Sequence, residues 1–271
     1  MDKLVLPIAL LCAIAATAIA AETAKPVQWR SIQSGVELAT FDTGKTPLGQ
    51  QGRLYVVRVT PGRAQLTVGL ASENGQRTRT AAEWCRASRF AVAINAGMFQ
   101  NDHLSNVGYL RHGTHLNNSR WNSYQAAVAM NRSRVEWFDL GAAGQKPPHV
   151  DDYGIVIQNL RLITRQRKNV WSKTEKRWSE AALAIDKDGR LLFLFSRAPY
   201  SMWELNNLIL GLPLDVAGAM HLEGGPEASL SIHGGGIDLD LSGSYETGFR
   251  PDDSNPEQWP IPNVIGVLRA Q

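Results

Sequence analysis

Two stretches of this chain decide its interpretation: Ile94-Asn95-Ala96-Gly97-Met98-Phe99 and Leu222-Glu223-Gly224-Gly225-Pro226-Glu227-Ala228-Ser229-Leu230. In each, an apolar run typical of a buried strand leads into small residues that carry one or two polar side chains. A strand end holds such side chains in fixed directions, and glycine lets a ligand approach the backbone closely. The two stretches therefore predict a site built on two strand ends.

The first 20 residues have the pattern of a secretory signal. Lys3 is followed by the apolar run 4–16, and Ala18-Ile19-Ala20 is typical of a cleavage site. The apolar run is too short for a comfortable membrane span, and no later run reaches that length. We therefore expect a signal peptide over 1–20 and a single domain over 21–271, located in the periplasm or secreted, with an uncleaved anchor as the alternative.

Composition is that of an ordinary globular domain, with 44% hydrophobic and 20% charged residues. After cleavage only Cys85 remains of the two cysteines, which excludes an intramolecular disulfide and favours a core held by apolar packing. At helical spacing within its segment, Cys85 is expected in the core rather than as a nucleophile. The net charge of +3 is small and scattered, so we expect no nucleic-acid partner.

One segment departs from this even distribution. Residues 161–176 hold Arg161, Arg165, Arg167, Lys168, Lys173 and Lys176. The segment is expected to be a solvated loop or hairpin, with the rim of a site for an anionic ligand as the alternative.

Alternating and apolar runs bounded by Gly and Pro predict a chain rich in strands. The expected strands are 36–41, 54–59, 64–70, 90–94, 109–111, 126–130, 135–138, 153–159, 162–165, 181–185, 191–196, 220–222, 229–233, 237–241 and 263–268. Two helices are marked by capping boxes, Thr80 with Glu83 and Ser201 with Glu204, and the second ends at Gly211 and Pro213. The fold class predicted is α+β, one domain dominated by mixed or antiparallel sheet.

Several strand pairings are also expected. Pro61-Gly62 predicts a hairpin turn, and hairpins are expected at Asp188-Gly189 and at 234–236. Strands 109–111, 126–130 and 135–138 are expected to form a meander. Strands 153–159 and 162–165 are expected to pair with each other.

Over residues 90–267 the chain resembles the phosphodiester glycosidase family. The resemblance is carried by Asn-Ala-Gly-Met-Phe at 95–99, Asn-Val-Gly-Tyr at 106–109, the hairpin 182–191, and Leu-Glu-Gly-Gly at 222–225 followed by Ser229. It implies the fold of that family and hydrolysis of a sugar phosphodiester. This chain departs from the pattern in two places, because the family usually has aspartate at the position of Glu223 and arginine at the position of Glu180.

Cleavage of a sugar–phosphate diester at the sugar carbon passes through an oxocarbenium-like state, which glycosidases manage with two carboxylates. Glu223 and Glu180 are the predicted catalytic pair. The leaving phosphate needs cationic and N–H donors, and Arg177 or Arg197 is expected to supply the cation. The alternatives are a turn-capping role for Glu223 and a surface role for Arg197.

The rest of the predicted site binds substrate. Asn95 is expected to bond a sugar or phosphate oxygen, or else to close a turn. Phe99, Trp121 and Trp178 are candidates for stacking on a sugar ring. The full set of predicted binding residues is Asn95, Gly97, Phe99, Asn106, Arg177, Arg197, Gly224, Gly225, Glu227 and Ser229.

No cofactor is expected, and a divalent metal ion is the alternative. His221 and Glu223 are expected on one strand face and are the best candidate ligand pair, whereas His112 and His115 lack a third ligand nearby. His233 with 234–236 imitates the oxyanion loop of esterases, but no Gly-x-Ser-x-Gly motif accompanies it, so a hairpin turn is expected. Asp238 and Asp240 are expected on the solvent face of their strand.

Together these patterns predict an exported hydrolase that cleaves a sugar-1-phosphate diester or a related envelope glycan bond. Its partner would be a carbohydrate or sugar phosphate. Two alternatives from other classes remain open: a glycan-binding module without catalysis, and a metal-dependent phosphodiesterase that cuts the P–O bond.

Overall fold

A computed structural model describes residues 27–46, 48–141 and 145–270. The predicted signal segment 1–20 lies outside the described residues. Within them, the strands form three sheets, and the named strands pair only in antiparallel fashion. The expected strand-dominated α+β class is confirmed.

The largest sheet of the described chain has seven strands. They are β1 (Arg30–Gln33), β2 (Val36–Lys45), β3 (Gln51–Val59), β11 (Arg161–Ile163), β12 (Trp178–Asp186), β13 (Leu191–Tyr200) and β14 (Val216–Gly224). Their order across the sheet is β1-β2-β3-β13-β12-β14-β11. The predicted hairpin over Asp188-Gly189 is confirmed, since β12 and β13 pair along most of their length.

Two five-stranded sheets complete the described fold. One contains β4 (Leu66–Leu70), β5 (Phe90–Asn95), β15 (Ser229–Gly234), β16 (Ile237–Ser242) and β17 (Asn263–Leu268), in the order β16-β15-β5-β17-β4. The other contains β6 (Leu110–His112), β7 (His115–Asn118), β8 (Ala126–Met130), β9 (Val135–Asp139) and β10 (Ile155–Asn159), in the order β7-β6-β10-β8-β9. The hairpin of β15 and β16 is also as predicted.

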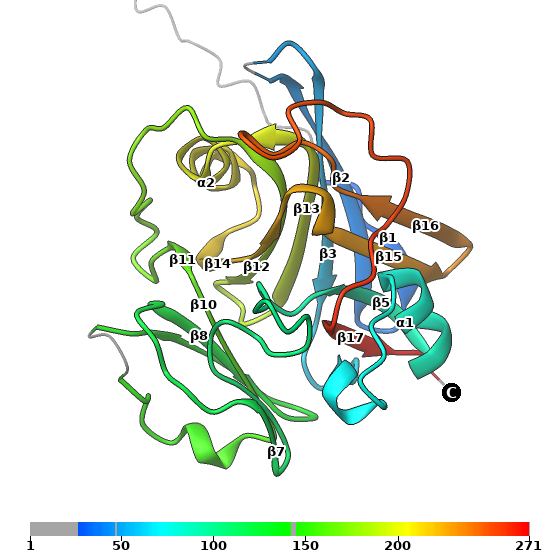
Figure 1. Cartoon of the computed structure of the whole chain (residues 1–271), viewed down its shortest axis with the longest axis vertical. Coiled ribbons are helices and arrows are strands. Elements are labelled where there is room, and N and C mark those ends of the chain that lie inside the picture. Colours follow the sequence, from blue (N-terminus) through cyan, green and yellow to red (C-terminus); the bar gives the residue numbers. More distant parts are fainter. Residues whose placement is uncertain (1–26, 47, 142–144, 271) are drawn as a thin grey trace, which may run out of the picture.

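Both predicted helices form with their capping boxes. Helix α1 (Ala81–Ser88) is capped by Thr80 with Glu83, and helix α2 (Met202–Gly211) by Ser201 with Glu204. Three short 3-10 turns are η1 (Ala71–Glu73), η2 (Val150–Asp152) and η3 (Gly225–Glu227). Helix α1 lies beside β5 and β17, and α2 covers one side of the seven-stranded sheet (Figure 1).

The main core fills the space between the sheets. Side chains from all three sheets join one buried cluster, for example Phe193 from β13, Ile94 from β5 and Val128 from β8. A second cluster joins α2 to the seven-stranded sheet, and a third holds Trp84 and Cys85 of α1 against Phe90. The expected core position of Cys85 is confirmed, and its burial raises the pKa of the thiol to about 12.

Three expected pairings are wrong, each because strand partners are chosen by long-range packing. The Pro61-Gly62 turn forms, but β3 enters the seven-stranded sheet and β4 pairs with β17. Strand β10 separates β6 from β8, so no simple meander forms. Only Leu160 lies between β10 and β11, which is too short for a hairpin turn, and the chain instead passes from one sheet to another. Strands β1 and β7 were not predicted.

Candidate active site

The two signature stretches meet although their strands belong to different sheets. Asn95, at the end of β5, donates from Nδ2 to the backbone oxygen of Glu227 at 3.0 Å, and its Oδ1 accepts the backbone N–H of Ser229 at 2.8 Å. Asn95 is almost completely buried, as is Ser229. Both residues therefore fasten the turn after β14 to β5. Neither lines the cavity described next, and the turn-closing interpretation of Asn95 matches these contacts.

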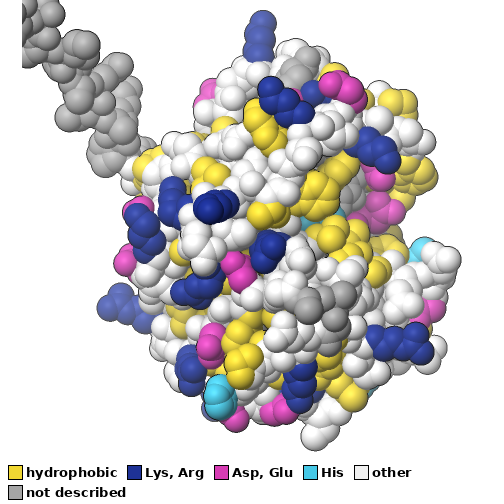
Figure 2. Space-filling model, turned by 90° about the vertical axis from the view of Figure 1, so that its left-hand side faces the viewer, with side chains coloured by type: hydrophobic (Ala, Val, Ile, Leu, Met, Phe, Trp, Pro, Cys, Tyr) yellow, Lys and Arg dark blue, Asp and Glu magenta, His cyan; other side chains and the backbone are white. Residues whose placement is uncertain are grey.

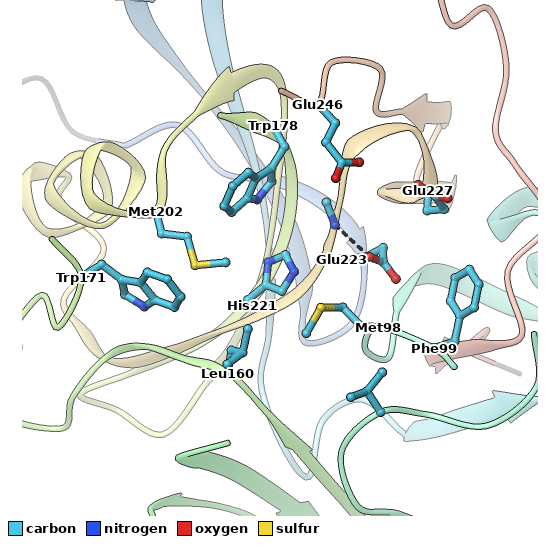
Figure 3. Close-up of a pocket in the computed structure, with 12 residues that line it drawn as sticks. Met98, Phe99, Leu160, Trp171, Trp178, Met202, His221, Glu223, Glu227 and Glu246 are labelled. Carbon is cyan, nitrogen blue, oxygen red and sulfur yellow. Dashed lines mark hydrogen bonds between the residues drawn. The ribbon is translucent and has the colours of Figure 1, made fainter. Parts of the chain in front are cut away.

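A cavity of about 520 Å³ opens where these stretches meet. One part of its wall is acidic and polar, formed by His221, Glu223, Glu227 and Glu246 (Figure 3). The rest of its lining is Gly224 and the apolar side chains of Met98, Phe99, Val107, Leu160, Trp171, Trp178 and Met202. Aromatic faces beside carboxylates are typical of sites that bind a sugar ring, which presents both apolar faces and hydroxyl groups.

The imidazole of His221 is held from behind by Glu180. Nδ1 of His221 lies 2.5 Å from Oε1 of Glu180, and the indole N–H of Trp178 donates to Oε2 of Glu180 at 2.6 Å. Glu180 and His221 are only 2% and 3% exposed. Burial favours the neutral imidazole, but the charge and hydrogen bond of Glu180 outweigh it and raise the pKa of His221. Glu180 thus does not line the cavity, and it contacts the cavity through His221.

Glu223 lies beside this pair and faces the cavity. Burial raises the pKa of Glu223 to about 8, although His221 and the Gly224 N–H, 3.1 Å from Oε1, act in the opposite direction. On β12, Ala181 pairs with Glu223 and the next residue, Ala182, pairs with His221. Leu222, which lies between them on β14, has no partner and forms a bulge. Bulges re-aim side chains near functional sites. His221 and Glu223 both line the cavity, with this bulge between them instead of the regular alternation that was expected.

The two glycines after Glu223 leave space for the side chains of Trp178 and Glu246, which line the cavity. A Cβ at Gly224 would lie 2.6 Å from Cδ1 of Trp178. A Cβ at Gly225 would lie 2.4 Å from Oε2 of Glu246, and Gly225 also adopts φ +64°, a left-handed conformation that favours glycine. Both glycines therefore permit side chains to pack directly on the backbone.

Glu246 is a site residue that the sequence analysis missed. Glu246 lies in the loop after β16, in a polar stretch of sequence without a pattern that distinguishes it. Its backbone forms isolated β-bridges with Trp178 and Arg250, and these hold it at the cavity. Burial raises the pKa of Glu246 and of Glu227, and the charge of Glu246 raises the latter further. The cavity therefore gathers three carboxyl groups that resist ionisation.

Gly97 and Asn106 form a layer behind the cavity. A Cβ at Gly97 would lie 2.7 Å from Oδ1 of Asn106 and 2.6 Å from Oδ1 of Asn159, so only glycine fits. Asn106 is completely buried and donates to the backbone oxygen of Gly108 at 3.1 Å. Asn159 donates to the backbone oxygen of Ala96 at 2.9 Å. These contacts hold the loop from which Phe99 projects into the cavity.

Neither predicted phosphate-binding arginine lines the cavity. Arg177 forms two hydrogen bonds with the carboxylate of Glu204, the capping residue of α2, at 2.9 and 3.0 Å. Arg197 lies within β13 and bonds Asp253 at 2.7 Å and the backbone oxygen of Asn255 at 2.8 Å. Their guanidinium groups are used to join distant segments of the chain. In the part of the chain that the structure describes, no Lys or Arg lines the cavity.

The aromatic candidates divide in the same way. Trp178 lines the cavity, whereas Trp121 stacks on Tyr109 at a centroid distance of 4.4 Å and does not. Trp171 lines the cavity and was not predicted; it comes from the basic segment 161–176. The only sequence signal for it was a large apolar side chain in a strongly polar stretch.

The other three histidines considered in the sequence analysis do not line the cavity. His233 is in the β15–β16 hairpin and contacts Asp238 and Asp240. His112 contacts Glu73, and His115 contacts Ser72. Among the described residues, no group of three His, Cys, Asp or Glu side chains is arranged to hold a metal ion.

Comparisons with known proteins agree with this geometry. A family model described as phosphodiester glycosidase matches residues 88–268. The fold and the carboxyl-lined cavity are thus found in a chain that belongs to the phosphodiester glycosidase family. The sequence gives no significant match among curated proteins.

Two solved structures share the fold. One is the catalytic domain of zebrafish N-acetylglucosamine-1-phosphodiester alpha-N-acetylglucosaminidase, auto-inhibited by its pro-peptide, with a TM-score of 0.64, 16% identity, and coverage of 90% of this chain and 88% of that one. The other is a hypothetical protein from Synechocystis, with a TM-score of 0.60, 18% identity, and coverage of 91% and 64%. The membership predicted from the sequence motifs is confirmed.

Proposed function

We propose that this chain is an exported hydrolase that cleaves the bond between the anomeric carbon of a sugar and an oxygen of a phosphodiester. The observation that carries the proposal is Glu223, a carboxyl group with a pKa raised to about 8, in an aromatic-lined cavity beside two further carboxyl groups. Membership of the phosphodiester glycosidase family supports the substrate class.

In this mechanism Glu223 is the acid. At neutral pH it carries a proton, which it gives to the leaving oxygen as the bond from the anomeric carbon breaks. The positive charge that develops on the sugar faces the carboxylates of Glu227 and Glu246. One of them accepts a proton from a water molecule whose oxygen bonds to the anomeric carbon. The products are the free sugar and a phosphate monoester.

His221 and Glu180 support this step without touching the reacting bond. When Glu223 gives up its proton, it becomes a carboxylate next to His221, whose charge lowers the pKa of Glu223. Glu180 stabilises that charge through its hydrogen bond to Nδ1. Glu180, predicted as a catalytic carboxylate, is therefore proposed here as a positioning residue.

The test offers the purified chain lacking residues 1–20 a panel of sugar-1-phosphate diesters and follows the release of free sugar. We expect turnover that Glu223→Gln removes. In water labelled with heavy oxygen, the label should enter the sugar, which marks C–O cleavage.

No turnover of any diester by a folded protein would overturn the proposal, and sugar-phosphate binding that survives Glu223→Gln would then identify a binding module. Label in the phosphate, with activity lost to a chelator and restored by a divalent ion, would identify a metal-dependent phosphodiesterase.

Export is part of the same proposal and rests on residues 1–20. The described residues contain no helix long and apolar enough to cross a membrane. Expression of the full chain in a bacterium with two membranes, followed by fractionation and N-terminal sequencing, should find a periplasmic or secreted protein that begins after Ala20. An intact N-terminus in the membrane fraction would contradict this and indicate an anchor.

A further inference from the structure

A second, smaller pocket adjoins the cavity. It has a volume of about 240 Å³ and is lined by Ser123, Gln125, Leu160, Arg161, Val170 and Trp171. Leu160 and Trp171 also line the main cavity, so the two spaces share a wall. Figure 3 places these two side chains on the opposite side of the cavity from Glu227 and Phe99.

This shared wall is fixed by hydrogen bonds. The indole N–H of Trp171 donates to the backbone oxygen of Arg161 at 2.8 Å, and the backbone N–H of His221 donates to the oxygen of Leu160 at 2.9 Å. Arg161 pairs with Met220 on β14, directly before His221. The side pocket is therefore fixed directly beside β14, the strand that carries His221 and Glu223.

Among the described residues, Arg161 is the single Lys or Arg that lines either space. Its Nη2 donates to Oε1 of Gln125 at 3.0 Å, while its buried Nε has no hydrogen-bond acceptor. Within the described residues no carboxylate forms an ion pair with it, in contrast to Arg177 and Arg197. The partly buried guanidinium thus lacks both a counter-charge and part of its acceptors.

We propose that the side pocket binds the phosphate of the substrate through Arg161, while the main cavity binds the sugar. The inference rests on the proposed function and deepens it. A phosphodiester placed beside the carboxylates of Glu227 and Glu246 would meet charges of its own sign, whereas a guanidinium offers several donors to phosphate oxygens. Figure 2 shows apolar side chains across the middle of one face of the molecule and Lys and Arg side chains around them. Of the two interpretations that the sequence leaves open for segment 161–176, we thus favour the rim of a site for an anionic ligand, formed at Arg161.

The kinetic test compares two substrates that carry the same sugar, a methyl phosphodiester and an uncharged methyl glycoside. We expect Arg161→Gln to raise KM for the diester about tenfold or more, the size expected for loss of a charge-assisted pair, and to change KM for the glycoside less than about twofold. Arg161→Lys should restore part of the diester affinity. The matched control is Arg165→Gln, which removes an exposed arginine of the same segment that lines neither space. Equal loss for both substrates, or an equal effect of Arg165→Gln, would overturn the proposal.

A binding measurement separates this proposal from the reaction itself. Calorimetry with methyl phosphate, a phosphate monoester of the product class, should show binding that Arg161→Gln weakens about tenfold and Glu223→Gln leaves in place. If methyl phosphate binds in this way while no diester is turned over, the side pocket stands and the proposed hydrolysis fails. If diesters are hydrolysed but methyl phosphate binds Arg161→Gln as well as the parent, the hydrolysis stands and the phosphate lies elsewhere.

Discussion

Nδ1 of His221 lies 2.5 Å from Oε1 of Glu180, and both side chains are almost completely buried. Sequence patterns assigned these residues separate roles, Glu180 as a catalytic carboxylate and His221 as a candidate metal ligand. Their contact makes them one unit, in which the carboxylate holds the imidazole and the imidazole faces the cavity. Glu180 thus acts on the cavity through His221.

Replacement of Glu223 by glutamine should lower kcat by about a hundredfold or more, because a preorganised proton donor at the reacting bond is worth a few kcal/mol. The fold should survive, since glutamine keeps the shape of the side chain. Glu227→Gln serves as the comparison and should cost clearly less, because Glu227 lies in the 3-10 turn η3, after Pro226, and is not held at the end of a strand. Steady-state kinetics and thermal unfolding of both variants check this, and equal losses would contradict it.

The raised pKa of Glu223 predicts two pH effects. As the acid of the reaction, Glu223 must be protonated, so activity should fall as pH rises through about 8. Its pKa in the folded chain lies above the ordinary value of 4.5, so folding binds a proton. The stability that this protonation contributes is full below pH 4.5 and is lost as pH rises toward 8. The melting temperature of Glu223→Gln relative to the parent should therefore increase from pH 5 to pH 8, and a constant difference would contradict the assignment.

Replacement of Glu180 by glutamine should lower the pKa of His221. Burial of the imidazole remains in this variant, whereas the carboxylate that favours the charged form is removed. Titration of the His221 ring by nuclear magnetic resonance measures the change directly. Trp178→Phe is the control, because it removes the second donor to Glu180 and keeps the carboxylate, so its effect on His221 should be smaller. An unchanged His221 titration in Glu180→Gln would show that the contact does not control the imidazole.

Gly225 and Gly236 form a matched pair for substitution by alanine. Both adopt left-handed backbone conformations, with φ of +64° and +72°, but only at Gly225 would a Cβ meet another group, Glu246. Each substitution should cost about 1 kcal/mol of stability or more for the backbone conformation. Gly225→Ala should in addition displace Glu246 and lower kcat, whereas Gly236→Ala should keep the parent kcat. Chemical unfolding and kinetics on both variants check this, and equal kcat values would show that the position of Glu246 is unimportant.

The fold was largely predictable where structure is local. Capping boxes marked the starts of α1 and α2, and glycine turns marked the hairpins β12–β13 and β15–β16. These signals lie within a few residues of the structure they produce. The pairings of β3, β4, β10 and β11 were not predictable, because they depend on which apolar faces meet between sheets.

The sequence by itself pointed to the segments at the ends of β5 and β14, which supply Phe99 and Glu223 to the cavity, and the motifs there indicated the family. Glycines and carboxyl residues that directly follow an apolar run are features of a short segment, so they can be recognised in the sequence alone. Only the tertiary structure decided which charges remain for a ligand. It pairs Arg177 with Glu204 and Arg197 with Asp253, and it brings Glu246 to the cavity. Arg161 forms no ion pair with any carboxylate of the described chain. Arg177 and Glu204 are 27 residues apart in the sequence, and Arg197 and Asp253 are 56 residues apart. No local sequence pattern selects between such distant partners.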